Sequence, residues 1–304
     1  MEHAPIPLYT SLPPRMTRRD ADGTDISDAY ARACVDSWIG SGFHPVTVNS
    51  RAEDPPGLAA QVAIEQRLLD RDARALYGRP FPYLSDLLAQ MRRHAPGVVA
   101  LTNADILLRL SPQSQRRIRE LRPGQCVICS RMDVDSPEAT QGCVYSGGFD
   151  FFAFRTEDLA GVETGDLALG VPWWDYFLPL WFYLSGMDRL KIDGASVLHL
   201  LHEERWDKAM WFSAGTLFLP MLRAQFESQA PASPRIARYF AQAHGVQRPA
   251  GFKKLGYVRR QMSAKGRMRN QRKLLGRLCN LNITTLDGWG HEAGNLRGGR
   301  DATA

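Results

Sequence analysis

An amide and a carboxylate interrupt one of the most apolar stretches of the chain. Asn103 and Asp105 lie between the apolar runs 98–102 (VVALT) and 106–108 (ILL). A carboxylate between two buried runs is costly unless it is paired or binds a cation. Carboxylate and amide oxygens are ligands for Mn²⁺ and Mg²⁺. The pair therefore indicates a divalent-cation site, although a simple turn is the alternative because Asn and Asp both favour turns.

Two histidines and a second carboxylate could join such a site. His199 and His202 end an apolar run with H-x-x-H spacing, which fits a metal or phosphate contact as well as core packing. Asp175 stands among aromatic residues in PWWDYFLPL. Indole rings around a carboxylate raise its pKa, as a general base requires, whereas a helix cap is the plainer alternative.

Paired glycines precede an aromatic segment further along the chain. Gly147 and Gly148 in YSGGFDFFAF either form a turn or let the backbone approach a flat ligand such as a sugar ring. The first predicted strand is followed by TSLPPR, and the chain contains no G-x-x-x-x-G-K-[ST] motif. The sequence is therefore neither that of a P-loop protein nor that of a classical dinucleotide-binding protein.

Apolar runs alternate with amphipathic segments over the first 225 residues. We predict strands at 6–12, 44–50, 98–102, 126–134 and 149–155, and helices at 27–42 (capped by Ser27), 57–70, 83–94, 111–121, from about 173, 206–228 and 233–244. This order predicts an α/β fold with a mostly parallel sheet flanked by helices. Such sheets bind ligands beyond the carboxyl ends of their strands. The polar residues at those predicted ends are Thr10, Ser11, Asn49, Asn103, Asp105, Arg131 and Asp133.

Charge is distributed unevenly along the chain of 304 residues. The net charge is +6, yet residues 253–277 hold ten Lys and Arg and no acidic residue, which leaves the remainder acidic. We therefore predict a domain over residues 1–228 and a helical, basic C-terminal extension over residues 229–304 with a flexible end. The extension is either a solvated arm or a contact with an anionic membrane surface.

The composition favours a soluble protein of the cytoplasm. We find no signal peptide at the N-terminus, and the longest apolar stretch, 171–186, contains Asp175 and is too short to span a bilayer. Five scattered cysteines are typical of a reducing compartment. We expect the protein in the cytoplasm, with association at the inner face of the membrane as an option.

The ordered motifs resemble those of a known enzyme family. The series is TSLPPR after the first strand, VTVNS, NAD-I, SRMD, GGFDFFAFR, an aromatic segment with one Asp, and HLLHE. It resembles the GT-A fold of nucleotide-sugar glycosyltransferases, especially family-2-like bacterial members with an Asn-x-Asp-Ile variant of the Asp-x-Asp metal motif. The resemblance covers about residues 6–210, and the basic extension has no counterpart in it.

The resemblance implies a role for each matching residue. Asp105, aided by Asn103, would hold Mn²⁺ or Mg²⁺ against the donor diphosphate, and His199 or His202 would complete this metal site. Asp175 would be the general base of an inverting transfer. The residues that would line the nucleotide pocket are Thr10, Ser11, Arg15, Asn49, Asn103 and, by its strand-end position, Arg131. The residues that would face the sugar and the acceptor are Gly147, Gly148, Asp150 and Trp174.

The leading hypothesis is therefore a metal-assisted glycosyltransferase. Its partners would be a nucleotide-sugar donor and a glycan, lipid-linked or protein acceptor. Two alternatives remain at this point: a GT-A-like protein that binds without catalysis, and a metal-dependent nucleic-acid enzyme. The acidic remainder of the chain argues against the second alternative, so we expect no specific nucleic-acid partner.

Overall fold

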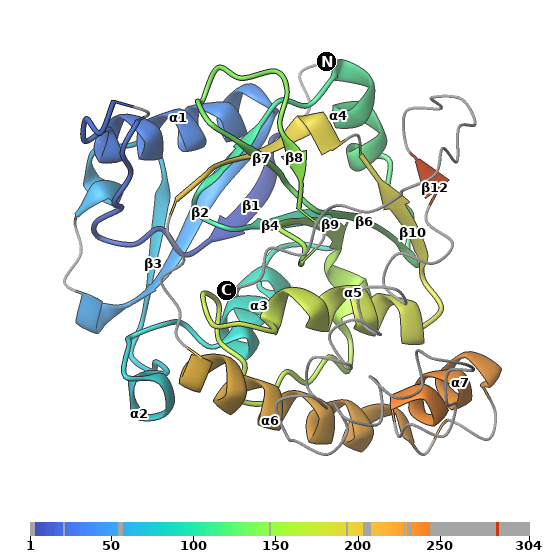
Figure 1. Cartoon of the computed structure of the whole chain (residues 1–304). Helices are drawn as coiled ribbons and strands as arrows, with labels where there is room; N and C mark the ends of the chain where they lie inside the picture. The colour runs from blue at the N-terminus through green and yellow to red at the C-terminus, as the bar shows by residue number, and fades with distance from the viewer. Residues whose placement is uncertain are drawn as a thin grey trace, which may run out of the picture.

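A large mixed sheet forms the centre of the molecule in the computed structural model, which describes residues 4–20, 22–53, 57–145, 147–192, 194–202, 208–227, 229, 233–243 and 284–285. Its eight strands lie in the order β12-β10-β6-β9-β4-β1-β2-β3 (Figure 1). Their bounds are Ile6–Thr10 (β1), Phe43–Ser50 (β2), Glu65–Leu69 (β3), Val98–Thr102 (β4), Gln125–Cys129 (β6), Phe151–Arg155 (β9), Asp188–Lys191 (β10) and Thr284–Thr285 (β12). Neighbouring strands are parallel except that β9 runs antiparallel to both β4 and β6.

A smaller sheet lies beside the central one and carries the candidate site. Its strands lie in the order β5-β11-β7-β8, with bounds Ile106–Leu108 (β5), Val197–Leu200 (β11), Met132–Val134 (β7) and Cys143–Val144 (β8). His199 of β11 pairs in register with Asp133 of β7 on one side and with Ile106 of β5 on the other. Because Asp105 directly precedes β5, this register brings three distant segments of the sequence to one point.

Helices cover both faces of the central sheet. Their bounds are Ser27–Gly40 (α1), Arg74–Tyr77 (α2), Leu84–Arg92 (α3), Pro112–Arg119 (α4), Trp174–Leu184 (α5), Lys208–Phe226 (α6) and Pro234–Ala243 (α7), with short 3₁₀ turns at Arg51–Glu53, Leu58–Ala60, Thr156–Leu159 and Gly194–Ser196. Figure 1 shows α1 and α4 on one face, α3 and α5 on the other, and α6 and α7 outside α5. Among the described residues, no helix combines the length and apolar character needed to cross a membrane.

Two hydrophobic cores result, one on each face of the sheet. Successive side chains of a strand point to opposite faces of the sheet, so the side chains of β9 alternate between the two cores. Phe152 and Phe154 belong to the core under α3, α5 and α6, whereas Phe151 and Ala153 belong to the core under α1 and α4. Both faces of β9 are therefore buried, which explains its continuous apolar sequence.

The predicted fold class is confirmed, since the molecule is α/β with a mostly parallel central sheet flanked by helices. The strand predicted at 98–102 and the helices predicted near α3, α4, α6 and α7 are confirmed within a few residues. The helix predicted at 57–70 is wrong, because this segment forms a 3₁₀ turn and the edge strand β3. The strand predicted at 126–134 is two strands, β6 and β7, which belong to different sheets.

Two further expectations concern the ends of elements and of the chain. Ser27 does not cap α1: it is the first helical residue, and its hydroxyl instead accepts a hydrogen bond from the backbone N–H of Arg18 at 2.9 Å. The basic segment 253–277 lies outside the described residues, so the division at residue 228 stays a prediction. Thr284–Thr285, from the predicted extension, pairs with β10 at the edge of the central sheet.

Candidate functional site

Asp105 lies in the turn between β4 and β5, at the carboxyl end of a central strand. Its carboxylate oxygen Oδ2 is 3.4 Å from Nε2 of His199 and 3.6 Å from Nε2 of His202. One ligand atom from each of these residues can be chosen so that all three lie within 4.8 Å of one another. Two ligands of one ion, each about 2.1 Å from it, lie roughly 3.0 to 3.4 Å apart at octahedral or tetrahedral angles. The three side chains could therefore hold one metal ion.

A second carboxylate orients the first histidine. Nδ1 of His199 is 2.9 Å from Oδ1 of Asp133, its register partner on β7. Since an ionised carboxylate only accepts hydrogen bonds, Nδ1 carries a proton and donates it to Asp133. Nε2 is thereby turned toward Asp105. A carboxylate behind a histidine in this way is a recurrent feature of metal sites, because it fixes the ring and raises the basicity of the ligand nitrogen.

Arg18 and Tyr30 complete the surroundings of Asp105, and neither follows from the motifs in the sequence. NH2 of Arg18 donates to Oδ2 of Asp105 at 2.5 Å, the same oxygen that faces the two histidines. Tyr30, from the buried face of α1, donates its hydroxyl to the backbone carbonyl of Asp105 at 2.8 Å. The same hydroxyl accepts the N–H of Leu200 at 2.9 Å. Tyr30 thus connects the turn of Asp105 to the strand that carries the histidines.

The charges of this cluster shift one another's ionisation. Burial alone would raise the pKa of Asp105, but His199, His202 and Arg18 hold it well below its ordinary range. Burial would likewise lower the pKa of His199, yet Asp105 and Asp133 together raise it above its ordinary value. In the metal-free protein the cluster is therefore a set of mutually stabilised opposite charges.

Asn103 and Arg131 meet at Asp150 rather than at the metal ligands. Asp150 is only 2% exposed, and its Oδ1 accepts hydrogen bonds from Nδ2 of Asn103 at 2.7 Å and from NH1 of Arg131 at 3.0 Å. Arg131 also donates to Asp133 at 2.8 Å. Asp150 thus ties the ends of β4, β6 and β9 together. A direct contact of Asp150 with a sugar stays a prediction.

Asp175 and Gly148, two residues assigned to the acceptor side, are neighbours in the structure. A side chain at Gly148 would collide with Oδ2 of Asp175, so only glycine fits there without displacing the carboxylate. Trp173, just before α5, adopts a left-handed φ of 84°, which is strained for a bulky residue. Its indole N–H donates to the carbonyl of Trp211 at 2.9 Å, so α6 holds the start of the helix that carries Asp175. Trp174 is buried in the core against Phe152.

A cavity of about 200 Å³ opens next to Asp105. The residues that line it include Ser11, Pro13, Met16, Arg18, Phe81, Asn103, Asp105 and His202. Of the residues predicted to bind the nucleotide, Ser11 and Asn103 therefore reach this cavity. Thr10 is buried, Arg15 is exposed, and neither is among the lining residues. Asn49 binds the backbone carbonyl of Leu12 at 2.9 Å, which fixes the loop after β1.

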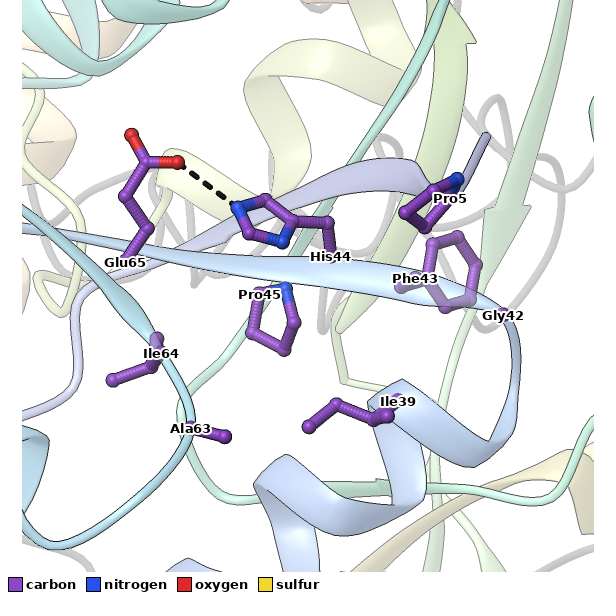
Figure 2. A pocket seen from close by; sticks show the side chains of 9 residues that line it. All are labelled: Pro5, Ile39, Gly42, Phe43, His44, Pro45, Ala63, Ile64 and Glu65. Carbon is purple, nitrogen blue, oxygen red and sulfur yellow. Dashed lines mark hydrogen bonds and ion pairs between the residues drawn. The ribbon is translucent and has the colours of Figure 1, made fainter. Parts of the chain in front are cut away.

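A second cavity, of about 540 Å³, lies at the opposite, amino ends of the strands. Figure 2 shows Ile39, Pro45 and Ile64 on its apolar wall and the contact between His44 and Glu65. Nε2 of His44 lies 2.9 Å from Oε2 of Glu65, within hydrogen-bond distance. Among the described residues, one group of three His, Cys, Asp or Glu side chains is close enough to share a metal ion. It consists of Asp105, His199 and His202. The site at the carboxyl ends of the strands is therefore the candidate functional site.

Comparisons with known proteins give distant structural likenesses. No protein-family model matches the chain, and no curated protein matches it. A nucleotidyl transferase from Methanothermobacter aligns with 73% of this chain and 100% of its own, at 14% identity and a TM-score of 0.36. A mannosyltransferase from Pyrobaculum calidifontis in complex with GDP-Man and Mn²⁺ aligns with 92% of this chain and 87% of its own, at 12% identity and a TM-score of 0.39. At such low identity, neither likeness establishes what this chain does.

Proposed function

We propose that the protein is a metal-assisted glycosyltransferase that moves a sugar from a nucleoside-diphosphate sugar to an acceptor hydroxyl. The observation that supports this proposal is the cluster of Asp105, His199 and His202, with Asp133 behind it, beside a cavity at the carboxyl ends of parallel strands. This edge of an open α/β sheet is where such folds bind nucleotide ligands. A carboxylate with two imidazoles is a donor set that suits a divalent transition metal.

The donor side of the reaction involves the metal ligands and the cavity. A divalent cation at Asp105, His199 and His202 would offset the charge that develops on the leaving nucleoside diphosphate. Asn103, held by its bond to Asp150, lines the same cavity and can donate to a phosphate or ribose oxygen. Because two of the three ligands are imidazoles, we favour Mn²⁺ over Mg²⁺, which prefers oxygen ligands and retains its water.

On the acceptor side we assign the base role to Asp175. In an inverting transfer the acceptor oxygen bonds to the anomeric carbon while the bond from that carbon to the diphosphate oxygen breaks. The acceptor proton passes to the carboxylate of Asp175, and the bonding pair leaves with the nucleoside diphosphate. The close packing of Gly148 against this carboxylate limits the positions that it can take. The same packing is what a positioned base requires.

The acceptor is proposed only as a class. A glycan, a lipid-linked sugar or a protein hydroxyl would each satisfy the chemistry. The basic segment 253–277 favours an acceptor at an anionic membrane surface, because clustered Lys and Arg are attracted to anionic lipids. Co-sedimentation with anionic vesicles tests this part alone: we expect binding at low salt that is lost at high salt, and equal binding to neutral vesicles would contradict it.

The test of the proposed function is a screen of nucleotide sugars. Thermal shift with UDP-, GDP- and dTDP-sugars, with and without Mn²⁺, should reveal a donor that stabilises the protein only when metal is present. Release of the nucleoside diphosphate is then measured for the wild type, for Asp105→Asn and for Asp175→Asn. Asp70→Asn is the matched control, because the carboxylate of Asp70 is 89% exposed and far from the site in the sheet order.

The outcomes separate the candidate activities. We expect both site variants to lose at least 100-fold in turnover, consistent with loss of a general base or of charge stabilisation, while Asp70→Asn keeps full activity. Metal-dependent binding of a nucleoside diphosphate without turnover of any donor would instead support a binding protein without catalysis. Formation of a nucleotide sugar from a nucleoside triphosphate and a sugar phosphate would replace the proposal with nucleotidyl transfer.

A further inference from the structure

We infer that Arg18 couples metal binding to nucleotide binding. In the metal-free protein its guanidinium pairs with the carboxylate of Asp105, and once that carboxylate binds the metal, the guanidinium pairs with the diphosphate of the nucleotide. This inference rests on the proposed function and adds a residue that the motifs of the sequence do not indicate. Arg18 would thereby favour binding of the metal and the nucleotide together over binding of the metal alone. Both binding equilibria, that of the metal and that of the nucleotide, can be measured without catalysis.

Arg18 is buried although it lies in the loop between β1 and α1. The residue is 4% exposed, and its NH2 contacts Oδ2 of Asp105 at 2.5 Å while NH1 donates to the carbonyl of Thr17 at 2.8 Å. Its Nε is buried and has no hydrogen-bond partner in the described part of the structure. A buried N–H without an acceptor costs free energy, so the guanidinium has an unfilled capacity to bind an anion.

The same oxygen of Asp105 faces Arg18 and both histidines. An ion bound by Asp105, His199 and His202 would therefore lie close to the guanidinium, and both cations would share one carboxylate oxygen. Like charges at that separation repel strongly in a partly buried site. Metal alone must thus either displace Arg18 from Asp105 or bind against its charge.

Charge balance explains why nucleotide and metal should enter together. Five charged side chains, joined through His199, form one cluster: Arg18, Arg131, Asp105, Asp133 and Asp150. With both histidines neutral, as metal ligands must be, its formal charge is one negative. A divalent ion makes this cluster net positive, and a diphosphate restores the balance. When Arg18 is replaced by a neutral residue, the cluster carries two negative charges, which a divalent ion alone neutralises.

The backbone of Arg18 is anchored, and its side chain lies beside the cavity. The N–H of Arg18 donates to the hydroxyl of Ser27 at 2.9 Å, and its carbonyl accepts the N–H of Ile26 at 3.0 Å, so the backbone is anchored to the start of α1. The side chain lines the 200 Å³ cavity together with Ser11, Asn103 and His202. A guanidinium released from Asp105 therefore stays beside the cavity, where it can form paired hydrogen bonds to phosphate oxygens.

The experiment is a pair of calorimetric titrations on the full-length protein. The first adds Mn²⁺ alone, and the second adds UDP or GDP, whichever stabilises the wild type, at saturating Mn²⁺. We expect Arg18→Gln to bind free Mn²⁺ about tenfold more tightly than the wild type and the nucleotide about tenfold more weakly. Arg18→Lys keeps the charge and should bind free Mn²⁺ nearly as the wild type does.

Arg67→Gln is the matched control. Arg67 also pairs with a carboxylate, that of Glu65 at 2.7 Å, and its guanidinium lies over the ring of Tyr9, but on β3 and away from the metal ligands. Its removal changes the net charge by the same amount and should leave both affinities unchanged. Equal effects of the two substitutions would show that net charge, not Arg18, is responsible, and would overturn the inference.

The results distinguish failure of the inference from failure of the proposed function. Unchanged Mn²⁺ affinity in Arg18→Gln, with Mn²⁺ binding still lost in Asp105→Asn, overturns the inference and leaves the metal site intact. Lack of any nucleotide or Mn²⁺ binding in the wild type contradicts the proposed function itself. If Arg18→Gln does not fold, the nucleotide affinity of Arg18→Lys tests the inference instead. An ammonium lacks the paired donors of a guanidinium, so direct pairing with the diphosphate predicts a loss of nucleotide affinity in this variant. A loss of less than twofold would contradict direct pairing.

Discussion

The most informative single substitution is Tyr30→Phe, because it removes one oxygen that joins two parts of the candidate metal site. The hydroxyl donates to the carbonyl of Asp105 and accepts the N–H of Leu200, 2.8 and 2.9 Å away. Leu200 stands between His199 and His202 in the chain. The substitution keeps the aromatic ring in the core under α1 and deletes only the two hydrogen bonds by which the hydroxyl joins the turn of Asp105 to β11.

The structure sets the size of the expected effect. The N–H of Leu200 and the carbonyl of Asp105 both lose a partner, and a buried polar group left without one costs about 1–3 kcal/mol. We therefore expect a loss of at least about 2 kcal/mol in the free energy of unfolding, equivalent to a decrease of at least about 3 °C in Tm for a chain of this length. Mutation of a residue that orients metal ligands typically lowers the metal affinity 10- to 100-fold. The Mn²⁺ affinity should therefore fall at least tenfold.

Calorimetry with Mn²⁺ and thermal unfolding of the metal-free protein measure the two effects separately. Tyr9→Phe is the matched control, since Tyr9 is also fully buried and its hydroxyl bonds the carbonyl of Gln90 at 3.3 Å, away from the metal ligands. We expect Tyr9→Phe to lower Tm and leave Mn²⁺ affinity unchanged. If Tyr30→Phe also changed the affinity by less than twofold, Tyr30 would be a core residue and its role in positioning the ligands would be refuted.

Two further predictions concern the acceptor base and the pH dependence of the metal site. Gly148→Ala should displace the carboxylate of Asp175 and reduce kcat at least tenfold, with unchanged Mn²⁺ affinity. Gly40→Ala is the control and should have no effect, because a Cβ at Gly40 would meet no other atom. Full activity of Gly148→Ala in steady-state kinetics would contradict this prediction. Since a doubly protonated His199 does not bind metal and its pKa is raised, the Mn²⁺ affinity should decline as the pH falls through that raised pKa. Asp133→Asn removes one cause of that shift, so in titrations the decline should move to lower pH; a midpoint unchanged by this substitution would exclude Asp133 as its cause.

The sequence predicted much of the sheet because its central strands are buried on both faces. Short, continuous apolar runs such as 98–102 are typical of strands that helices cover on both sides. The segment 57–70 was misleading because its apolar residues, among them Leu58, Val62 and Leu69, repeat with helical spacing. Its second half is nevertheless the edge strand β3, which is half-buried along most of its length. Its strand structure depends on the pairing with β2 and on the contact of Glu65 with His44 of β2, which no local pattern reveals.

The candidate site was predictable where it consists of polar residues at strand ends. Asp105 follows β4 and His202 follows β11, whereas Asp133 and His199 lie within β7 and β11, and the register of the smaller sheet brings these four residues together. Arg18 lies in a loop of no regular pattern, and its burial follows only from the fold. In the sequence, Tyr30 resembles one more apolar residue on the buried face of α1, because the partners of its hydroxyl are 75 and 170 residues away.

The central claim is that Asp105, His199 and His202 bind one divalent metal at the edge of a nucleotide pocket. Anomalous diffraction from crystals grown with Mn²⁺ and a nucleoside diphosphate tests it most directly. We expect one strong manganese peak within bonding distance of Oδ2 of Asp105 and Nε2 of both histidines, with the diphosphate on its open side. A manganese peak elsewhere, or a bound nucleotide with no metal between these three side chains, would contradict the claim.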